Sequence, residues 1–150
     1  MVADLVVTWE RARRFTLARQ HLMARAVPGS MVPVIGHICG LQSQMKLAPE
    51  HMLWARVEDF RREELAKALF EDRSLVRLWL MRGTIHIIPS ADLPMFHRAM
   101  RRKWDDRWIR WMDDRMSRDK RQALYPLIME LLREPGTRQE LQARVRMRQG

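Results

Sequence analysis

Two short runs of strand-forming residues, separated by a turn, constrain the fold of this chain more than any other feature. Leu75–Met81 is almost continuously apolar, and Thr84–Ile88 is rich in β-branched residues. Between them stand Arg82 and Gly83, and Pro89 ends the second run. Strand formers on both sides of a glycine-containing turn are typical of a β-hairpin. We therefore predict a hairpin over residues 75–88.

The segments before this hairpin have the spacing of short helices. Thr8 is a plausible N-cap for a helix that reaches about residue 23, and Pro28-Gly29-Ser30 breaks the chain after it. Further helices are predicted over about 32–41, 48–57 and 61–71. Short helices followed by a hairpin follow the element order of a winged helix, that is, a helix-turn-helix plus a wing. The expected fold class is mainly α with a small β-hairpin.

The segments after the hairpin predict further helices. Ser90 is expected to cap a long helix over about 91–115, and another helix follows over about 119–133. Pro135-Gly136 then precedes Thr137-Arg138-Gln139-Glu140, which has the pattern of a capping box. A helix, a turn and a capped helix begin a helix-turn-helix. We expect a first winged-helix domain over 1–90, then a long linking helix and the start of a second, incomplete winged-helix unit over 91–150.

The charge of the chain predicts an anionic partner. The sequence has 28 basic and 18 acidic residues, a net charge of +10, and most of the basic residues are arginine. The planar guanidinium matches phosphate oxygens and the guanine edge, so nucleic acid is the first expectation and a membrane surface the second. A genome rich in GC would also favour arginine codons, whatever the function of the protein.

The remaining composition excludes several other classes of protein. No apolar run approaches the length that spans a bilayer, and the amino terminus lacks the layout of a signal peptide, so we expect a cytoplasmic protein. The single cysteine, Cys39, cannot form an internal disulfide and is expected to be a buried apolar residue. The histidines lack the spacing of a metal site, so we predict no metal and no cofactor.

Five segments together resemble one family, the winged-helix DNA glycosylases of the AlkZ and YcaQ kind. The matching letters are WERARRFTLARQHL, GLQSQ, LWARV, ALFEDRSLV and WLMRGTIHIIPSADL, which lie in order between residues 8 and 97. The resemblance implies winged-helix units in tandem, curved around double-stranded DNA, that excise alkylated or crosslinked bases. The remainder of the chain resembles the family loosely, and the chain is shorter than half of a typical family member.

The resemblance also assigns a catalytic pair. One branch of the family carries Gln-x-Gln, and this chain has Gln42-Ser43-Gln44, although the middle residue is usually apolar in that branch. By the resemblance, Gln42 and Gln44 hold the water that attacks the sugar as the base departs. Two glutamine amides can orient one water without adding charge, which suffices for an N-alkylated purine because it is already a good leaving group. The alternative interpretation is a solvated glutamine pair at the end of a helix.

Other residues are candidates for contacts with DNA. Arg82 lies at the predicted wing tip, and Arg98, Arg101 and Arg102 cluster on one face of the predicted long helix. His86 corresponds to a family histidine, so it either faces the substrate or the DNA, or is a structural histidine that is hydrogen-bonded within the hairpin. Trp104, Trp108 and Trp111 recur at steps of four and three, which favours a packed helical face over base stacking. The acidic pairs 105–106 and 113–114 are expected to form ion pairs with arginines one helical turn away.

Three hypotheses about function therefore follow from the sequence. The first is a DNA glycosylase that hydrolyses the N-glycosidic bond of alkylated or crosslinked bases. The second is a non-catalytic winged-helix DNA-binding module or a truncated, inactive relative. The third is a basic protein that binds only another protein.

Overall fold

A computed structural model describes residues 7–149, with side chains described at all of these positions except 101–108 and 149. The chain divides into two compact units, Met1–Arg101 and Arg102–Gly150. Helix α5 (Leu93–Asp113) begins in the first unit and ends in the second. The predicted domain boundary at residue 90 remains a proposal.

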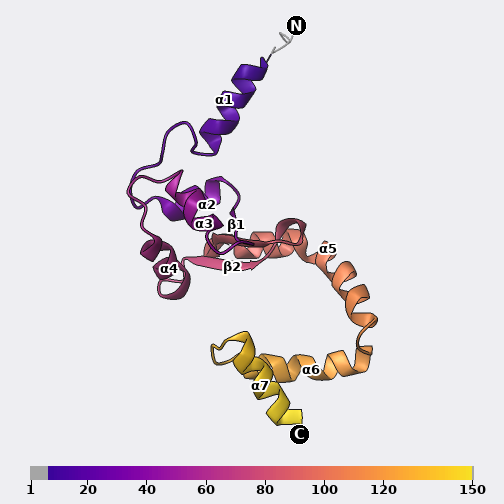
Figure 1. Cartoon of the computed structure of the whole chain (residues 1–150). Coiled ribbons are helices and arrows are strands. Elements are labelled where there is room, and N and C mark those ends of the chain that lie inside the picture. The colour runs from indigo at the N-terminus through magenta and orange to yellow at the C-terminus, as the bar shows by residue number, and fades with distance from the viewer. Residues whose placement is uncertain (1–6, 150) are drawn as a thin grey trace. The chain divides into compact units, whose positions relative to one another are not determined.

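The first unit combines short helices with a small sheet (Figure 1). Its elements before α5, in chain order, are α1 (Trp9–Arg19), α2 (Met31–His37), β1 (Leu41–Gln42), α3 (Ala48–Trp54), α4 (Arg62–Phe70), β2 (Leu75–Trp79), the 3₁₀ turn η1 (Met81–Gly83), β3 (Ile85–Pro89) and the 3₁₀ turn η2 (Ser90–Asp92). The second unit holds α6 (Arg118–Leu131) and α7 (Arg138–Gln149). The fold is mainly helical with a three-stranded antiparallel sheet.

The sheet has the strand order β1-β3-β2, with both pairs antiparallel. Strands β2 and β3 pair from Leu75 with Pro89 to Trp79 with Ile85, which confirms the predicted hairpin. The third strand was not predicted. In it, Leu41 pairs with Ile87 and Gln42 with His86, so the Gln42-Ser43-Gln44 segment lies along the central strand.

The two faces of the sheet pack against different helices because strand residues alternate in direction. One face contributes Leu41, Leu75 and Ile87 to a core with α2, α3 and α4, in which Ile35 and Leu53 are fully buried. The opposite face packs Ile88 against Phe96 at the start of α5. The sheet is therefore held from both sides, and its register is fixed by apolar burial.

A tight turn between α2 and β1 determines where β1 begins. Gly40 has φ 96°, and an added Cβ would lie 2.9 Å from Ile88 Cγ2 and 3.1 Å from the Ile87 carbonyl oxygen. Cys39, just before it, has φ 65° and is exposed, so the prediction of a buried thiol was wrong. The turn directs the Cys39 side chain outward, although its sequence neighbours are apolar.

The caps of the predicted helices had mixed outcomes. Thr8 accepts a hydrogen bond from the Arg11 N–H at 3.3 Å, as expected for an N-cap. The prediction that Ser90 caps the long helix was wrong, because its hydroxyl donates to the Arg73 carbonyl at 2.6 Å. The chain first makes a 3₁₀ turn, and α5 starts only at Leu93.

Helix α1 carries its apolar side chains without burying them. None of its residues is buried, and Trp9 and Phe15 are 83% and 68% exposed. The helix ends at Arg19, earlier than predicted, and His21 just beyond it has φ 53°. A backbone bridge between Ala26 and Val57 then joins the following segment to the residues just after α3.

In the second unit, α6 and α7 pack together (Figure 1). The predicted capping box at the start of α7 is confirmed. The Thr137 N–H donates to Glu140 Oε2 at 2.7 Å, and the Glu140 N–H donates to Thr137 Oγ1 at 3.2 Å. Arg148 also pairs with Glu130 at 3.2 Å, so part of the basic charge of α7 is neutralised by α6.

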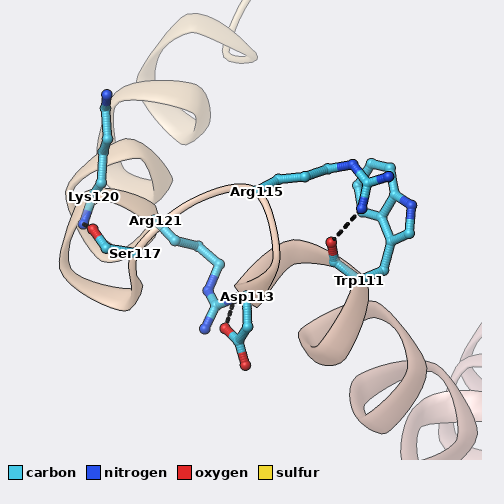
Figure 2. Close-up of polar contacts among 6 residues, drawn as sticks. All are labelled: Trp111, Asp113, Arg115, Ser117, Lys120 and Arg121. Carbon is cyan, nitrogen blue, oxygen red and sulfur yellow. Dashed lines mark hydrogen bonds and ion pairs between the residues drawn. The ribbon is translucent and has the colours of Figure 1, made fainter.

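The turn between α5 and α6 is held by polar contacts (Figure 2). Ser117 caps α6 by accepting from the Lys120 N–H at 3.4 Å. Asp113 pairs with Arg121 at 2.7 Å, eight residues away, so the prediction of a partner one helical turn away was wrong for this carboxylate. Asp105 and Asp106 lie outside the residues whose side chains are described.

The tryptophan stripe is described only at its last member. Trp111 is 49% exposed, and the Arg115 guanidinium lies over its ring at 4.2 Å from the centroid. Trp104 and Trp108 lie outside the residues whose side chains are described. None of the described helices combines the length and apolar character needed to cross a bilayer.

Candidate active site

The Gln42-Ser43-Gln44 segment lies where β1 ends beside the central strand β3. The Ser43 N–H donates to the Ile85 carbonyl at 2.7 Å, which extends the ladder one residue past β1. The Ile85 N–H donates in turn to Gln44 Oε1 at 3.1 Å. The Gln44 side chain thus completes a backbone ladder, and its NH₂ group still offers two donors.

Ser43 is fixed by an arginine from the other outer strand. Arg77 Nε donates to Ser43 Oγ at 2.9 Å, and Arg77 Nη2 donates to the Ser43 carbonyl at 2.8 Å. Ser43 itself is 3% exposed. The Ser43 hydroxyl gives Arg77 a second acceptor, which an apolar residue at this position would not supply.

Gln42 lies in a different environment from Gln44. Its side chain is exposed, and among the described residues no hydrogen bond to it is found. It pairs across the ladder with His86, which pairs in turn with Leu78, so these three side chains share one face of the sheet. Gln42 can therefore both donate to and accept from a solvent molecule or ligand.

His86 is buried, at 4% exposure. Its Nδ1 lies 3.0 Å from the Thr84 carbonyl oxygen. Because a carbonyl can only accept, Nδ1 carries the proton and donates. This environment fits the structural alternative for His86, a histidine hydrogen-bonded within the hairpin, and a direct contact with DNA would require the ring to become exposed.

A cleft of about 390 Å³ opens beside Gln44. Helix α4 contributes mostly apolar residues to its lining, and the other elements contribute several polar and charged residues. The lining residues are Ser43, Gln44, Lys46, Pro49, Glu50, Arg62, Leu65, Ala66, Leu69, Phe70, Arg77 and Ile87. Among the lining residues, Arg62 pairs with Glu50 at 3.3 Å. Apolar residues with a few polar groups among them are the usual lining of a site for a small ligand.

The predicted DNA-contacting arginines are described only in part. Arg82 is exposed in the hairpin turn with φ 57°, next to Gly83 with φ 77°. Arg98 is exposed on α5. Arg101 and Arg102 lie outside the residues whose side chains are described. Among the described residues, no cluster of three or more His, Cys, Asp or Glu side chains is placed to hold a metal ion.

Sequence reasoning did not identify Arg77 as part of the site. It lies inside the apolar run that predicted β2, where it reads as an outward-facing residue of a strand. Two unusual residues could have pointed to it: Arg77 is a charged residue within an apolar strand, and Ser43 is a serine at a position where the family resemblance implies an apolar residue. Only the antiparallel register of three strands brings them together.

Residues 35–150 match the family model for AlkZ-like DNA glycosylases. This chain belongs to the AlkZ-like DNA glycosylase family. The matched range contains Gln42-Ser43-Gln44, the whole sheet and the second unit, whereas α1 precedes it. The resemblance found in the sequence is therefore confirmed at the level of the family.

Two comparisons with individual proteins agree with this assignment. An interstrand DNA cross-link repair glycosylase of Streptomyces sahachiroi is 32% identical over 85 residues, which cover 57% of this chain and 22% of that protein. The solved structure of Streptomyces sahachiroi DNA glycosylase AlkZ aligns with a TM-score of 0.68 and 24% identity. The alignment covers 85% of this chain and 34% of the AlkZ chain, and at this identity the likeness shows the fold alone. The chain thus spans about a third or less of these relatives.

Proposed function

We propose that this chain is the DNA-binding and water-positioning part of a DNA glycosylase that hydrolyses the N-glycosidic bond of alkylated or crosslinked bases. The observation that carries the proposal is the position of Gln44. Its amide oxygen is held by the Ile85 N–H at 3.1 Å beside an open cleft, within a segment that matches the AlkZ-like family. Residues 1–90 form the first winged-helix domain in this proposal, and 91–150 the linking helix and part of a second unit.

The order of elements supports a winged-helix arrangement of the first domain. The elements follow in the order α2, β1, α3, α4 and the hairpin β2–β3. Strand β1 pairs with β3 on the side opposite to β2. In this arrangement α3 and α4 form the helix-turn-helix, and the turn at Arg82 and Gly83 forms the wing. The exposed charge of Arg82 then lies where a wing meets the sugar–phosphate backbone.

The chemistry assigned to the glutamine pair is the orientation of one water molecule. Gln44 Oε1 accepts from the Ile85 N–H, its NH₂ group donates to the water, and the exposed Gln42 carboxamide accepts a proton of the same water. Neither group is a strong base. The pair therefore fits a base that leaves readily, such as an N-alkylated purine whose positive charge disappears as the bond breaks.

The arginines supply affinity for double-stranded DNA in this proposal. Arg82, Arg98, Arg101 and Arg102 neutralise phosphates, while the glutamines act at the sugar. Hydrolysis by a positioned water requires no metal and no cofactor, and we expect a cytoplasmic location where DNA is accessible.

The decisive experiment is base release from a duplex that carries N7-alkylguanine, measured with excess protein. We expect release by the parent chain and loss of release in the double variant Gln42→Ala/Gln44→Ala. Gln44→Glu is the matched control for the fold, because its carboxylate can still accept the Ile85 hydrogen bond. Release that survives the double variant would refute the assigned roles of both glutamines.

A second function is favoured by one specific observation. The Gln44–Ile85 hydrogen bond gives Gln44 a structural role that a non-catalytic DNA-binding module would also need. In that case duplex binding is salt-dependent and intact in the parent and the double variant, and neither releases a base. Base release and a salt titration of duplex binding, measured on the parent and the double variant, therefore separate the glycosylase from the binding module.

A further inference from the structure

Arg77 reaches across the central strand of the sheet to hold the segment between the two glutamines. Its position in the register is opposite Ile87, and Ile87 is opposite Leu41, so the three residues form one row across β2, β3 and β1. From this row the guanidinium extends toward the end of β1. There its Nε and Nη2 each donate to Ser43, at 2.9 and 2.8 Å.

This contact changes which groups complete the ladder. In a hydrogen-bonded antiparallel pair, two opposite residues exchange both of their backbone bonds. Ser43 and Ile85 exchange only one, from the Ser43 N–H to the Ile85 carbonyl. The Ser43 carbonyl accepts instead from Arg77, and the Ile85 N–H donates to Gln44 Oε1. Two side chains have thus replaced the missing backbone bond: Arg77 supplies a donor for the Ser43 carbonyl, and Gln44 supplies an acceptor for the Ile85 N–H.

We infer that Arg77 is a positioning residue for the proposed catalytic pair. By holding the Ser43 carbonyl away from Ile85, it leaves the Ile85 N–H for Gln44, which turns the Gln44 NH₂ group toward solvent and any bound ligand. The Ser43 hydroxyl, 3% exposed as a residue, supplies the second acceptor that fixes the plane of the guanidinium. This inference rests on the proposed function for its consequence in catalysis, but its structural content is independent of activity.

The competing role for Arg77 is direct attraction of phosphate. Arg77 is exposed as a residue and lines the same cleft as Lys46 and Arg62. A phosphate contact would make DNA affinity depend on its charge, and it would leave the Gln44 carboxamide where it is. The two roles therefore differ in what a substitution changes.

The first measurement is amide hydrogen exchange in the chain 1–150, read by NMR for each residue. In Arg77→Ala, we expect the Ser43 and Ile85 amides to exchange about tenfold faster relative to the Ile87 amide. Arg77→Lys keeps the charge but cannot reach both acceptors, so we expect a partial effect. Arg13→Ala removes an equal charge from α1 and is the control. Unchanged Ser43 and Ile85 exchange in Arg77→Ala would overturn the inference.

A second variant covers the case in which Arg77→Ala does not fold. Ser43→Ala removes only the hydroxyl and keeps the carbonyl contact. We therefore expect the Ser43 and Ile85 amides to exchange faster than in the parent, and this increase should be smaller than the increase in Arg77→Lys. If both Ser43→Ala and Arg77→Lys leave these amides as protected as in the parent, Arg77 does not hold the segment.

The second measurement separates positioning from phosphate binding. With excess protein on the N7-alkylguanine duplex, we expect Arg77→Ala to lower the single-turnover rate at saturation about tenfold or more, with the same Kd and the same salt dependence as Arg13→Ala. A raised Kd with a smaller salt dependence and an unchanged rate would assign Arg77 to phosphate and refute positioning. If the parent releases no base, the proposed function fails for this chain, and the exchange data alone decide the inference.

Discussion

The Ile85 N–H donates to Gln44 Oε1 at 3.1 Å, at the position where a regular ladder would use the carbonyl of Ser43. The two glutamines of the Gln-x-Gln segment are therefore not equivalent. Gln44 is part of the sheet as well as of the proposed site, whereas Gln42 contributes an exposed side chain beside it. Substitutions at the two positions should separate stability from catalysis.

Gln44→Ala should destabilise the chain, and Gln42→Ala should not. Removing the Gln44 carboxamide leaves the Ile85 N–H without its partner, which costs about 1 kcal/mol in the free energy of unfolding. The exposed Gln42 side chain should change that free energy by less than about 0.5 kcal/mol. Urea denaturation of both variants measures the difference, and equal stabilities would mean that water replaces the Gln44 bond completely.

Gly40→Ala should disrupt the start of β1. The new Cβ would meet Ile88 Cγ2 at 2.9 Å and the Ile87 carbonyl at 3.1 Å, and the residue would keep a positive φ. Gly29→Ala is a matched control, since its φ is 78° but nothing lies within 4 Å of the added Cβ. We expect about 1 kcal/mol of backbone strain in the control and a larger loss at Gly40. Similar melting temperatures for the two variants would contradict this account of the turn.

The sequence predicted those parts of the fold that depend on local patterns. The hairpin was evident from the two strand-forming runs around Arg82-Gly83, and the capping box from Thr137 and Glu140, because each depends on residues near one another in the chain. Strand β1 was not evident, since two residues show no periodicity and it forms only by pairing with β3. Cys39 was misplaced for a related reason: its outward direction follows from a positive φ that its apolar neighbours do not reveal.

The candidate site, too, could be predicted from the sequence only where it depends on a local pattern. Gln42 and Gln44 could be singled out from a short motif, but the hydrogen bonds that distinguish them come from β2 and β3, more than thirty residues away. The sequence did not decide between a structural role for His86 and a contact with DNA. Its burial and its bond to Thr84 reflect the register of the hairpin. Residue identity thus indicated the chemistry, while orientation required the tertiary pairing.

Arg82→Gly should weaken DNA binding while preserving the hairpin. Arg82 has φ 57°, a conformation that glycine adopts without strain, so the turn should form as before. Loss of one phosphate contact should lower the affinity and reduce the slope of log K against log salt by about 1. Arg73→Gly is the matched control, because Arg73 also has positive φ (51°) and is exposed at the other end of the hairpin. Equal losses of affinity in both variants would show that Arg82 contributes only its share of the net charge.

The helicity of α7 should depend on pH through Glu140. Hydrogen bonds from the Thr137 N–H and hydroxyl, with a smaller contribution from the charge of Arg144, lower the pKa of this carboxylate. A carboxylate with a lowered pKa in the folded state stabilises that state above its unfolded pKa, and the stabilisation is lost as the pH falls through the folded pKa. We therefore expect α7 to lose helical structure on acidification, at a pH below the ordinary pKa of a glutamate.

Glu140→Gln is the control that identifies the responsible group. Its amide oxygen can still accept from Thr137, but it does not titrate and carries no charge to meet Arg144 and the helix N-terminus. The variant should begin with less α7 helicity at neutral pH, and that helicity should change little on acidification. Backbone NMR shifts of residues 138–148 measure both effects for α7 alone, which separates them from acid unfolding of the first unit. If the variant loses α7 helicity over the same pH range as the parent, the acid-sensitive contact lies elsewhere, and the Arg148–Glu130 ion pair, also anchored on a carboxylate, becomes the next group to test.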